Sequence, residues 1–214
     1  QEQRGLKIFS PSPDTSALVS AVPREMAEIK VLVPIADGSE DIETACITDV
    51  LVRAGAKVVT ASVMPDKNNV TFARGLKVTA DCHIKDCAGL EWDAIALPGG
   101  LPGANHLRDC EELKTLLAEQ TSKSKVTAAV CASPAVVFNT HGFLGEKATC
   151  YPAPKFKETM AEGMWQDAKV VADGHIITSQ GPGTSLQFAL KIVEKLYGDD
   201  KANELAGALL TTRD

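Results

Sequence analysis

Short apolar runs alternate with amphipathic stretches along most of the chain. Residues 37–56 carry acidic residues at their start and a glycine near their end, which are the start and stop signals of a helix. Residues 110–120 form a second amphipathic stretch. The apolar runs are rich in β-branched residues, as is typical of parallel strands covered on both faces, and occupy residues 28–36, 57–63, 93–100 and 125–131. This alternation predicts an α/β fold with a doubly wound, mostly parallel central sheet.

Hairpin signals interrupt this pattern at two places. Extended pieces on either side of residues 73–75 (Ala-Arg-Gly) predict a hairpin at the edge of the sheet, and a second is predicted around residues 173–174. The last long helix is expected to open at Thr184, whose spacing to Gln187 is that of a capping box.

The start of the chain differs from the rest. Residues 1–28 are rich in Ser, Pro and Ala and have no clear period, so we interpret them as a flexible leader. An organelle-targeting remnant, plastid or mitochondrial, is the alternative interpretation. Residues 29–214 have the size of a single domain.

Composition and charge narrow the class of protein. Of the 214 residues, 44% are hydrophobic and 23% are charged, which is typical of a soluble globular protein. The formal net charge of −6 gives no electrostatic footprint for nucleic acid or an anionic membrane surface. No apolar run approaches the roughly 20 residues of a membrane-spanning helix. We therefore expect neither nucleic acid nor a membrane as a partner.

The six cysteines have no repeating spacing, which favours a reduced, intracellular compartment, in the first place the cytoplasm, over a disulfide framework. Cys82, His83 and Cys87 form the one cluster that suggests a metal. A second ligand pair at finger-like spacing is missing, so no metal site is expected.

Cys131 stands where the strand of residues 125–131 ends and a helix beginning near Pro134 is predicted. Ligands of open α/β sheets bind beyond the carboxyl ends of the strands, and so short a connection has the geometry of a nucleophile elbow. The helix N-terminus is expected to lower the pKa of the thiol. The alternative is that Cys131 is one more small buried apolar side chain.

Glu43 is predicted to face the sheet. On a helix starting near Glu40, it falls at the centre of the apolar stripe, whereas Asp41 points the opposite way. Burial is expected to raise the pKa of this carboxyl and to keep it protonated, as a hydrogen-bond donor to the thiol or to a sulfinate. Alternatively, Glu43 merely complements the helix dipole.

Paired glycines end the neighbouring strand, in the stretch LPGG at residues 97–100. The backbone at Gly99 and Gly100 can present amides to a developing oxyanion, with the Ala132 amide as a second donor. A simple turn is the alternative interpretation of such a pair.

Together these stretches resemble the ThiJ/PfpI superfamily, and within it the parkinsonism-associated protein deglycase branch. The matching stretches are GSEDIET, RAGAKV, LPGGLPGA, AAVCASPAV and TSQGPGTSLQFALKIVEKL, within about residues 29–210. The resemblance implies a flavodoxin-like sandwich, a homodimer, and an oxidation-prone Cys131 paired with a protonated Glu43. It also implies cofactor-free glyoxalase activity on methylglyoxal, deglycase activity on its adducts, and a role in the oxidative-stress response with chaperone behaviour.

Some positions depart from the family pattern. Tyr151 stands where many animal members carry a histidine near the active cysteine, and Gln180 replaces the arginine of SRGPGT. By the resemblance, Arg74 belongs to the cysteine's surroundings, while Arg53 and Pro182 lie at the periphery of the dimer interface or of the site.

Three functions follow as hypotheses. In the first, the Cys131 thiolate attacks the aldehyde carbon of methylglyoxal, the amides of Gly100 and Ala132 hold the oxygen, and Glu43 moves the proton. In the second, Cys131 is oxidised to sulfinate in a redox sensor or chaperone without turnover. The third is a cysteine amidase or peptidase, which is less favoured because no histidine can be assigned beside the cysteine.

Overall fold

The structure is a computed structural model that describes residues 28–214. The leader predicted over residues 1–28 therefore lies, except for residue 28, outside the described residues.

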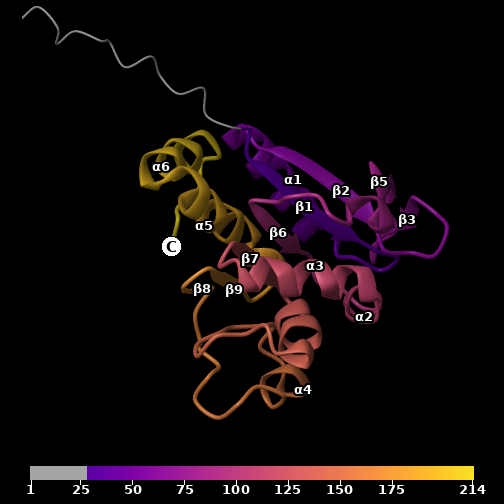
Figure 1. The fold of residues 1–214 in the computed structure, drawn as a ribbon. Helices are drawn as coiled ribbons and strands as arrows, with labels where there is room; N and C mark the ends of the chain where they lie inside the picture. The colour runs from indigo at the N-terminus through magenta and orange to yellow at the C-terminus, as the bar shows by residue number, and fades with distance from the viewer. Residues whose placement is uncertain (1–27) are drawn as a thin grey trace, which may run out of the picture.

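A seven-stranded sheet forms the centre of the molecule (Figure 1). All neighbouring strands are parallel except the last pair, which is antiparallel, so the predicted mostly parallel sheet is confirmed. In spatial order the strands are β5 (Cys82–His83), β2 (Lys57–Ser62), β1 (Lys30–Ile35), β6 (Ala94–Leu97), β7 (Val126–Val130), β9 (Ile176–Ser179) and β8 (Val170–Asp173).

The chain reverses its direction of travel across the sheet between β1 and β6. From β1 it first builds outward through β2 to β5, and then returns to β6 on the other side of β1. In doubly wound sheets such a switch point opens a crevice at the carboxyl ends of the strands, where ligands bind.

Helices cover both faces of the sheet (Figure 1). One face is covered by α1 (Asp41–Ala54), α5 (Ser185–Tyr197) and α6 (Asp199–Ala208), and the other by α2 (Gly103–Arg108), α3 (Glu111–Ser122), the 3₁₀ turn η1 (Ile84–Cys87) and the π-helix η2 (Pro134–Asn139). Along β1, Val31 and Val33 pack against the first layer and Leu32 against the second, as the two-residue period of a strand requires. The short elements α4 (Pro154–Lys157) and η3 (Pro182–Thr184) lie near the carboxyl ends of the strands.

The hairpin predicted around residues 73–75 forms, but not at the edge of the main sheet. Its strands, β3 (Asn69–Thr71) and β4 (Lys77–Thr79), make a separate two-stranded sheet, and β5 occupies the edge. The reason is that the hairpin is tied to the loop after β1. The Ala73 amide donates to the Ser39 carbonyl at 2.8 Å, and the Gly38 amide donates to the Thr71 carbonyl at 2.9 Å. The turn therefore lies over the end of β1.

Two expectations for the C-terminal part have opposite outcomes. The hairpin around residues 173–174 is confirmed as the antiparallel pair of β8 and β9. The prediction of a capping box at Thr184 is wrong, because α5 begins without a side-chain cap. The Thr184 hydroxyl instead forms a hydrogen bond with the Ser179 hydroxyl at 2.7 Å and donates to the Gly181 carbonyl at 2.9 Å.

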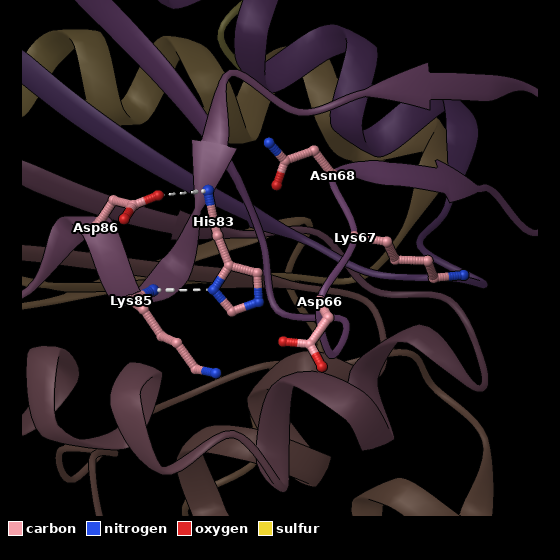
Figure 2. A pocket seen from close by; sticks show the side chains of 6 residues that line it. All are labelled: Asp66, Lys67, Asn68, His83, Lys85 and Asp86. Atoms are coloured by element: carbon pink, nitrogen blue, oxygen red, sulfur yellow. Dashed lines mark hydrogen bonds between the residues drawn. The ribbon is translucent and has the colours of Figure 1, made fainter.

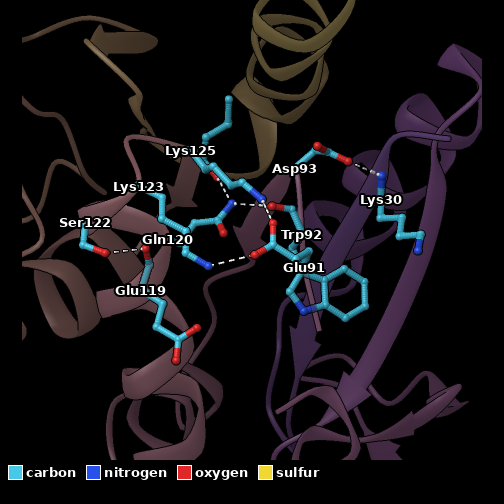
Figure 3. A network of polar contacts seen from close by, with 10 residues as sticks. Lys30, Glu91, Trp92, Asp93, Glu119, Gln120, Ser122, Lys123 and Lys125 are labelled. Carbon is cyan, nitrogen blue, oxygen red and sulfur yellow. Dashed lines mark hydrogen bonds and ion pairs between the residues drawn. The ribbon is translucent and has the colours of Figure 1, made fainter. Parts of the chain in front are cut away.

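A polar network closes the opposite, amino end of the parallel strands (Figure 3). The carboxylate of Glu91 pairs with Lys123 at 2.8 Å and with Lys125 at 2.7 Å. The Gln120 side chain donates to the carbonyls of Trp92 and Val126. These contacts tie the loop before β6 to the connection between α3 and β7.

None of the helices described for residues 28–214 combines the length and apolarity that a bilayer crossing requires.

Candidate active site

Cys131 occupies a sharp turn directly after β7. Its φ is 64°, in the left-handed region that a residue with a side chain rarely adopts, and η2 begins three residues later at Pro134. The Cys131 amide donates to the Ser179 carbonyl at 2.9 Å, and its carbonyl accepts from the Tyr151 amide at 2.7 Å. These two bonds hold the strained backbone in place. The predicted tight turn, with the geometry of a nucleophile elbow, is confirmed.

Glu43 lies in the first turn of α1 and is completely buried, so the prediction that it faces the sheet is confirmed. It does not cap the helix, because the Glu40 side chain already accepts from the Glu43 amide at 2.9 Å. Its Oε2 accepts from the Gly99 amide at 2.7 Å. Its Oε1 has no hydrogen-bond partner of ordinary geometry among the described residues, while the carboxyl as a whole interacts with the Cys131 thiol.

The Glu43 carboxyl can hold a proton near neutral pH. Burial raises its pKa from an ordinary 4.5 to about 7, although the Gly99 amide and the Cys131 thiol oppose that rise. A carboxyl with this pKa can both accept and return a proton under physiological conditions.

The pKa of the Cys131 thiol is raised, so the predicted lowering is wrong. Burial is the main cause, followed by the charge of the Glu43 carboxylate, while the backbone amides of Gly100 and Ala132 favour the thiolate. The predicted lowering rested on the helix N-terminus alone, with Glu43 neutral. Because the thiolate and the carboxylate repel each other, at least one of the two groups stays protonated. Once Glu43 is protonated, its charge no longer opposes the thiolate.

Gly99 has to lack a side chain for this pair to meet. A Cβ at this position would lie 2.6 Å from the Cβ of Cys131 and 2.9 Å from Oε2 of Glu43. Neither contact is tolerable, because real Cβ atoms essentially never approach other heavy atoms this closely. The glycine therefore lets the acid and the thiol approach from different elements.

Cys131 is partly exposed and opens into a cavity of about 420 Å³ at the carboxyl end of the sheet. The five residues that sequence reasoning placed around the cysteine or at its periphery and that line this cavity are Arg74, Gly100, Ala132, Tyr151 and Pro182. The structure thus brings together residues from the β3–β4 turn, the glycine pair, the elbow, the segment before α4 and the start of η3.

Arg53 does not belong to this group. It pairs with Asp49 at 2.6 Å on the exposed side of α1 and does not line the cavity. Its placement at the periphery of the site is not supported by this lining. Its placement at a dimer interface stays a prediction.

Sequence reasoning missed several lining residues. Phe156 meets the Tyr151 ring edge-to-face, with 6.3 Å between the ring centroids, and the Lys155 Nζ lies 4.8 Å from the centre of the Phe156 ring. Their signal was their position four and five residues after Tyr151, in the first turn of α4. The full set of missed lining residues is Glu40, Ala73, Leu101, Lys155 and Phe156.

No histidine lines the cavity, although all four histidines of the chain lie within the described residues. His141, the nearest to Cys131 in sequence, bonds through Nε2 to the Arg108 carbonyl at 2.8 Å. Within residues 28–214, no group of three or more His, Cys, Asp or Glu side chains is arranged to hold a metal ion.

Comparison with known proteins gives concordant matches. A model of the DJ-1/PfpI family matches residues 29–195. Protein DJ-1 homolog B of Arabidopsis thaliana is 46% identical over 182 residues, covering 85% of this chain and 41% of that protein. The glutathione-independent glyoxalase DJR-1.2 of Caenorhabditis elegans is 38% identical over 175 residues, covering 82% of this chain and 91% of that protein. The chain spans less than half the length of the Arabidopsis relatives that it matches.

Solved structures agree with the sequence matches. The structure of oxidized DJ-1 from Toxoplasma gondii superposes with a TM-score of 0.83 at 44% identity, covering 86% of this chain and 99% of that one. The structure of DJ-1beta from Drosophila melanogaster superposes with a TM-score of 0.79 at 36% identity, covering 86% of this chain and 99% of that one. The predicted flavodoxin-like sandwich is thereby confirmed. Because a family model spans most of the described residues and these relatives share both sequence and fold with them, the chain belongs to the DJ-1/PfpI family.

Proposed function

We propose that the protein is a cofactor-independent glyoxalase that converts methylglyoxal to lactate, and a deglycase that acts on methylglyoxal adducts, through Cys131. The observation that carries the proposal is the contact between a partly exposed thiol and a buried carboxyl whose pKa is raised to about 7. The Caenorhabditis elegans relative, a glutathione-independent glyoxalase, supports the same activity.

The first step is a transfer of the thiol proton to Glu43. The sulfur of Cys131 then attacks the aldehyde carbon and forms a hemithioacetal, whose oxygen takes that proton from Glu43 and leaves the carboxylate free to act as a base. The amides of Gly100 and Ala132, which favour the thiolate in the free protein, donate in this proposal to the oxygen of the hemithioacetal, which is bonded to the carbon that the sulfur attacks.

The second step is an internal redox shift. A proton leaves the former aldehyde carbon and is returned to the neighbouring carbonyl carbon, with Glu43 as the group that accepts and releases it. The hydroxyl proton of the hemithioacetal passes to the ketone oxygen, so the aldehyde carbon is oxidised to a thioester while the ketone carbon is reduced to an alcohol. Water then hydrolyses the thioester, which releases lactate and restores the thiol.

The rest of the cavity supports binding of a small oxygen-rich substrate. Arg74 and Lys155 supply positive charge and Tyr151 supplies a hydroxyl, which can donate to the second carbonyl. A cavity of about 420 Å³ exceeds the size of methylglyoxal. The surplus room supports entry of an adducted side chain or nucleotide for deglycation.

The test is lactate formation from methylglyoxal by the full chain. We expect Cys131→Ala to reduce the rate by roughly 10³-fold or more, because the nucleophile is lost. Cys46→Ser is the matched control, since Cys46 is also a partly exposed free thiol but lies on α1 outside the cavity. Full lactate production by Cys131→Ala would overturn the proposal.

A second candidate function is a redox sensor or chaperone in which Cys131 is oxidised to sulfinate without turnover. The structural similarity to oxidized DJ-1 of Toxoplasma gondii favours this alternative. A protonated Glu43 and two amides can donate to sulfinate oxygens. Mass spectrometry after graded peroxide should find sulfinate at Cys131 before any other cysteine carries it, and equal sulfinate at all six would contradict this function. A cysteine amidase or peptidase gains no support, because no histidine lines the described cavity.

We also propose a homodimer. Three large apolar side chains on α1 and in the β3–β4 turn are more than half exposed: Ile42 at 54%, Val52 at 57% and Leu76 at 51%. A second copy of the chain would cover such side chains. We expect sedimentation equilibrium to give a dimer for the wild type and a monomer for Val52→Glu. A monomeric wild type would contradict the proposal.

A further inference from the structure

Two cysteines outside the cavity lie in contact with each other. Cys82 is in β5 and Cys87 is the last residue of η1, and their Sγ atoms are 3.6 Å apart. All six cysteines lie within residues 28–214, and no other pair of them has its sulfurs in contact there. From this geometry we propose that Cys82 and Cys87 form a reversible intramolecular disulfide when the protein meets hydroperoxide, independently of Cys131.

The turn between the two cysteines is already closed. The His83 amide donates to Oδ2 of Asp86 at 3.2 Å, and the Lys85 amide donates to Nδ1 of the His83 ring at 3.2 Å, as Figure 2 shows. These bonds draw residues 83 and 86 together, and with them the cysteines that flank them. A disulfide has an S–S length of about 2.05 Å, so the sulfurs have to approach by roughly 1.5 Å.

The position of Cys82 at the sheet edge allows this movement. β5 has only two residues and pairs with one neighbour, through Cys82 opposite Ala61 and His83 opposite Ser62. A short edge strand opens at a lower free-energy cost than the central strands. The shift therefore leaves the sheet from β2 to β8 intact.

A metal site is the weaker interpretation of this cluster. Because Nδ1 of His83 accepts from the Lys85 amide, Nε2 carries the proton and donates to the Met64 carbonyl at 2.9 Å. Both ring nitrogens are thus engaged, and the thiols have no third ligand in the described part of the chain. Two thiols in contact without a third ligand fit two-electron oxidation.

The different exposure of the two thiols gives the order of events. Cys82 is partly exposed, whereas Cys87 is 1% exposed and packs in the core. The Cys82 sulfur attacks one oxygen of the hydroperoxide, the O–O bond breaks, and a sulfenic acid and one water (or alcohol) result. The Cys87 sulfur then attacks the sulfenic sulfur, the S–S bond forms and the S–O bond breaks, releasing water. The two thiols together lose two electrons and two protons, and the peroxide is reduced.

The pair is expected to react slowly. Burial raises the pKa of both thiols, that of Cys87 to about 12, so little thiolate is present at neutral pH. The disulfide should therefore appear on sustained exposure to peroxide. Once formed, it keeps Cys82 from irreversible oxidation to sulfinate or sulfonate.

The test uses a tryptic digest of the full chain under non-reducing conditions. Cleavage after Lys85 puts Cys82 and Cys87 on separate peptides, residues 78–85 and 86–108, which only a disulfide can hold together. We expect mass spectrometry of peroxide-treated wild type to find these peptides joined with the loss of two hydrogens, and dithiothreitol to separate them. Treatment with iodoacetamide before digestion prevents exchange among thiols.

Variants give the controls. Cys82→Ser and Cys87→Ser should abolish the joined peptides, while Cys46→Ser should retain them as the matched control. Cys131→Ala should also retain them, which separates this proposal from the proposed activity. Cys82→Ser is expected to keep wild-type lactate formation.

Three outcomes in the wild type would overturn the proposal, whatever the variants' folding: sulfinate at Cys82 while Cys87 remains a free thiol, a disulfide of either cysteine to another partner, or two free thiols after sustained exposure to peroxide.

Discussion

The two ends of the central sheet treat their carboxyl groups in opposite ways. At the amino end, Glu91 is exposed and pairs with two lysines, which lower its pKa to about 2 (Figure 3). At the carboxyl end, Glu43 is buried without any cation, and its pKa rises to about 7. The first group is permanently charged and ties loops together. The second can exchange a proton near neutral pH. Acid–base chemistry is therefore expected at the carboxyl end of the sheet, where the carboxyl group is isolated from solvent and from any cation.

The largest effect that this comparison predicts is on the rate after Glu43→Gln. Glutamine keeps an oxygen that can accept from the Gly99 amide but cannot carry the proton between carbon atoms. We expect kcat/KM for methylglyoxal to fall by about 10²–10⁴-fold, and the ionisation near neutral pH to disappear from the pH–rate profile. An unchanged rate and an unchanged pH–rate profile would show that Glu43 does not transfer the proton.

The second prediction concerns stability against pH. Because the pKa of Glu43 is about 7 in the folded protein and 4.5 ordinarily, the folded state binds more protons than the unfolded state between these values. The free energy of unfolding should therefore fall as pH rises from about 4.5 to 7, by roughly 3 kcal/mol from this group alone. Urea denaturation at several pH values measures this. In Glu43→Gln the contribution should vanish, and an equally steep fall in that variant would refute the assignment.

The third prediction is that Gly99→Ala separates the acid from the thiol. The added methyl group overlaps Cys131 and Glu43, so we expect a loss of about 1–3 kcal/mol in unfolding free energy together with reduced activity. Gly207→Ala is the matched control, because a Cβ there meets nothing within 4 Å and alanine favours the helix. Equal behaviour of the two variants in denaturation and activity assays would contradict the expected crowding.

The smallest effect is expected at the amino end. Glu91→Gln removes an exposed charge from two lysines, and exposed ion pairs contribute little in physiological salt. We expect the thermal midpoint in differential scanning calorimetry and kcat/KM to stay close to wild type. A loss of activity comparable to that of Glu43→Gln would show that the two ends are not functionally distinct.

The sequence predicts those features that depend on local pattern. The apolar runs predict the strands, and the short step from β7 to Pro134 predicts the tight turn at Cys131. The period of α1 puts Glu43 on the buried face. Each of these follows from residues that are neighbours along the chain.

Features that depend on packing between distant segments were not predictable in the same way. Backbone bonds to the loop after β1, which no periodicity encodes, bring Ala73 and Arg74 over the cavity. Lys155 and Phe156 reach it through the placement of α4. The direction of the Cys131 pKa shift depends on the charge of Glu43, which belongs to another element.

The backbone of Cys131 is held by β9 on one side and by the Tyr151 amide on the other. The orientation of the thiol is therefore set by main-chain atoms that every residue type except proline possesses. Side chains around the rim, such as Arg74, Tyr151 and Lys155, can be exchanged without turning the sulfur away. Directed evolution of this scaffold toward larger or differently charged carbonyl compounds should accordingly succeed at the rim while the nucleophile stays fixed.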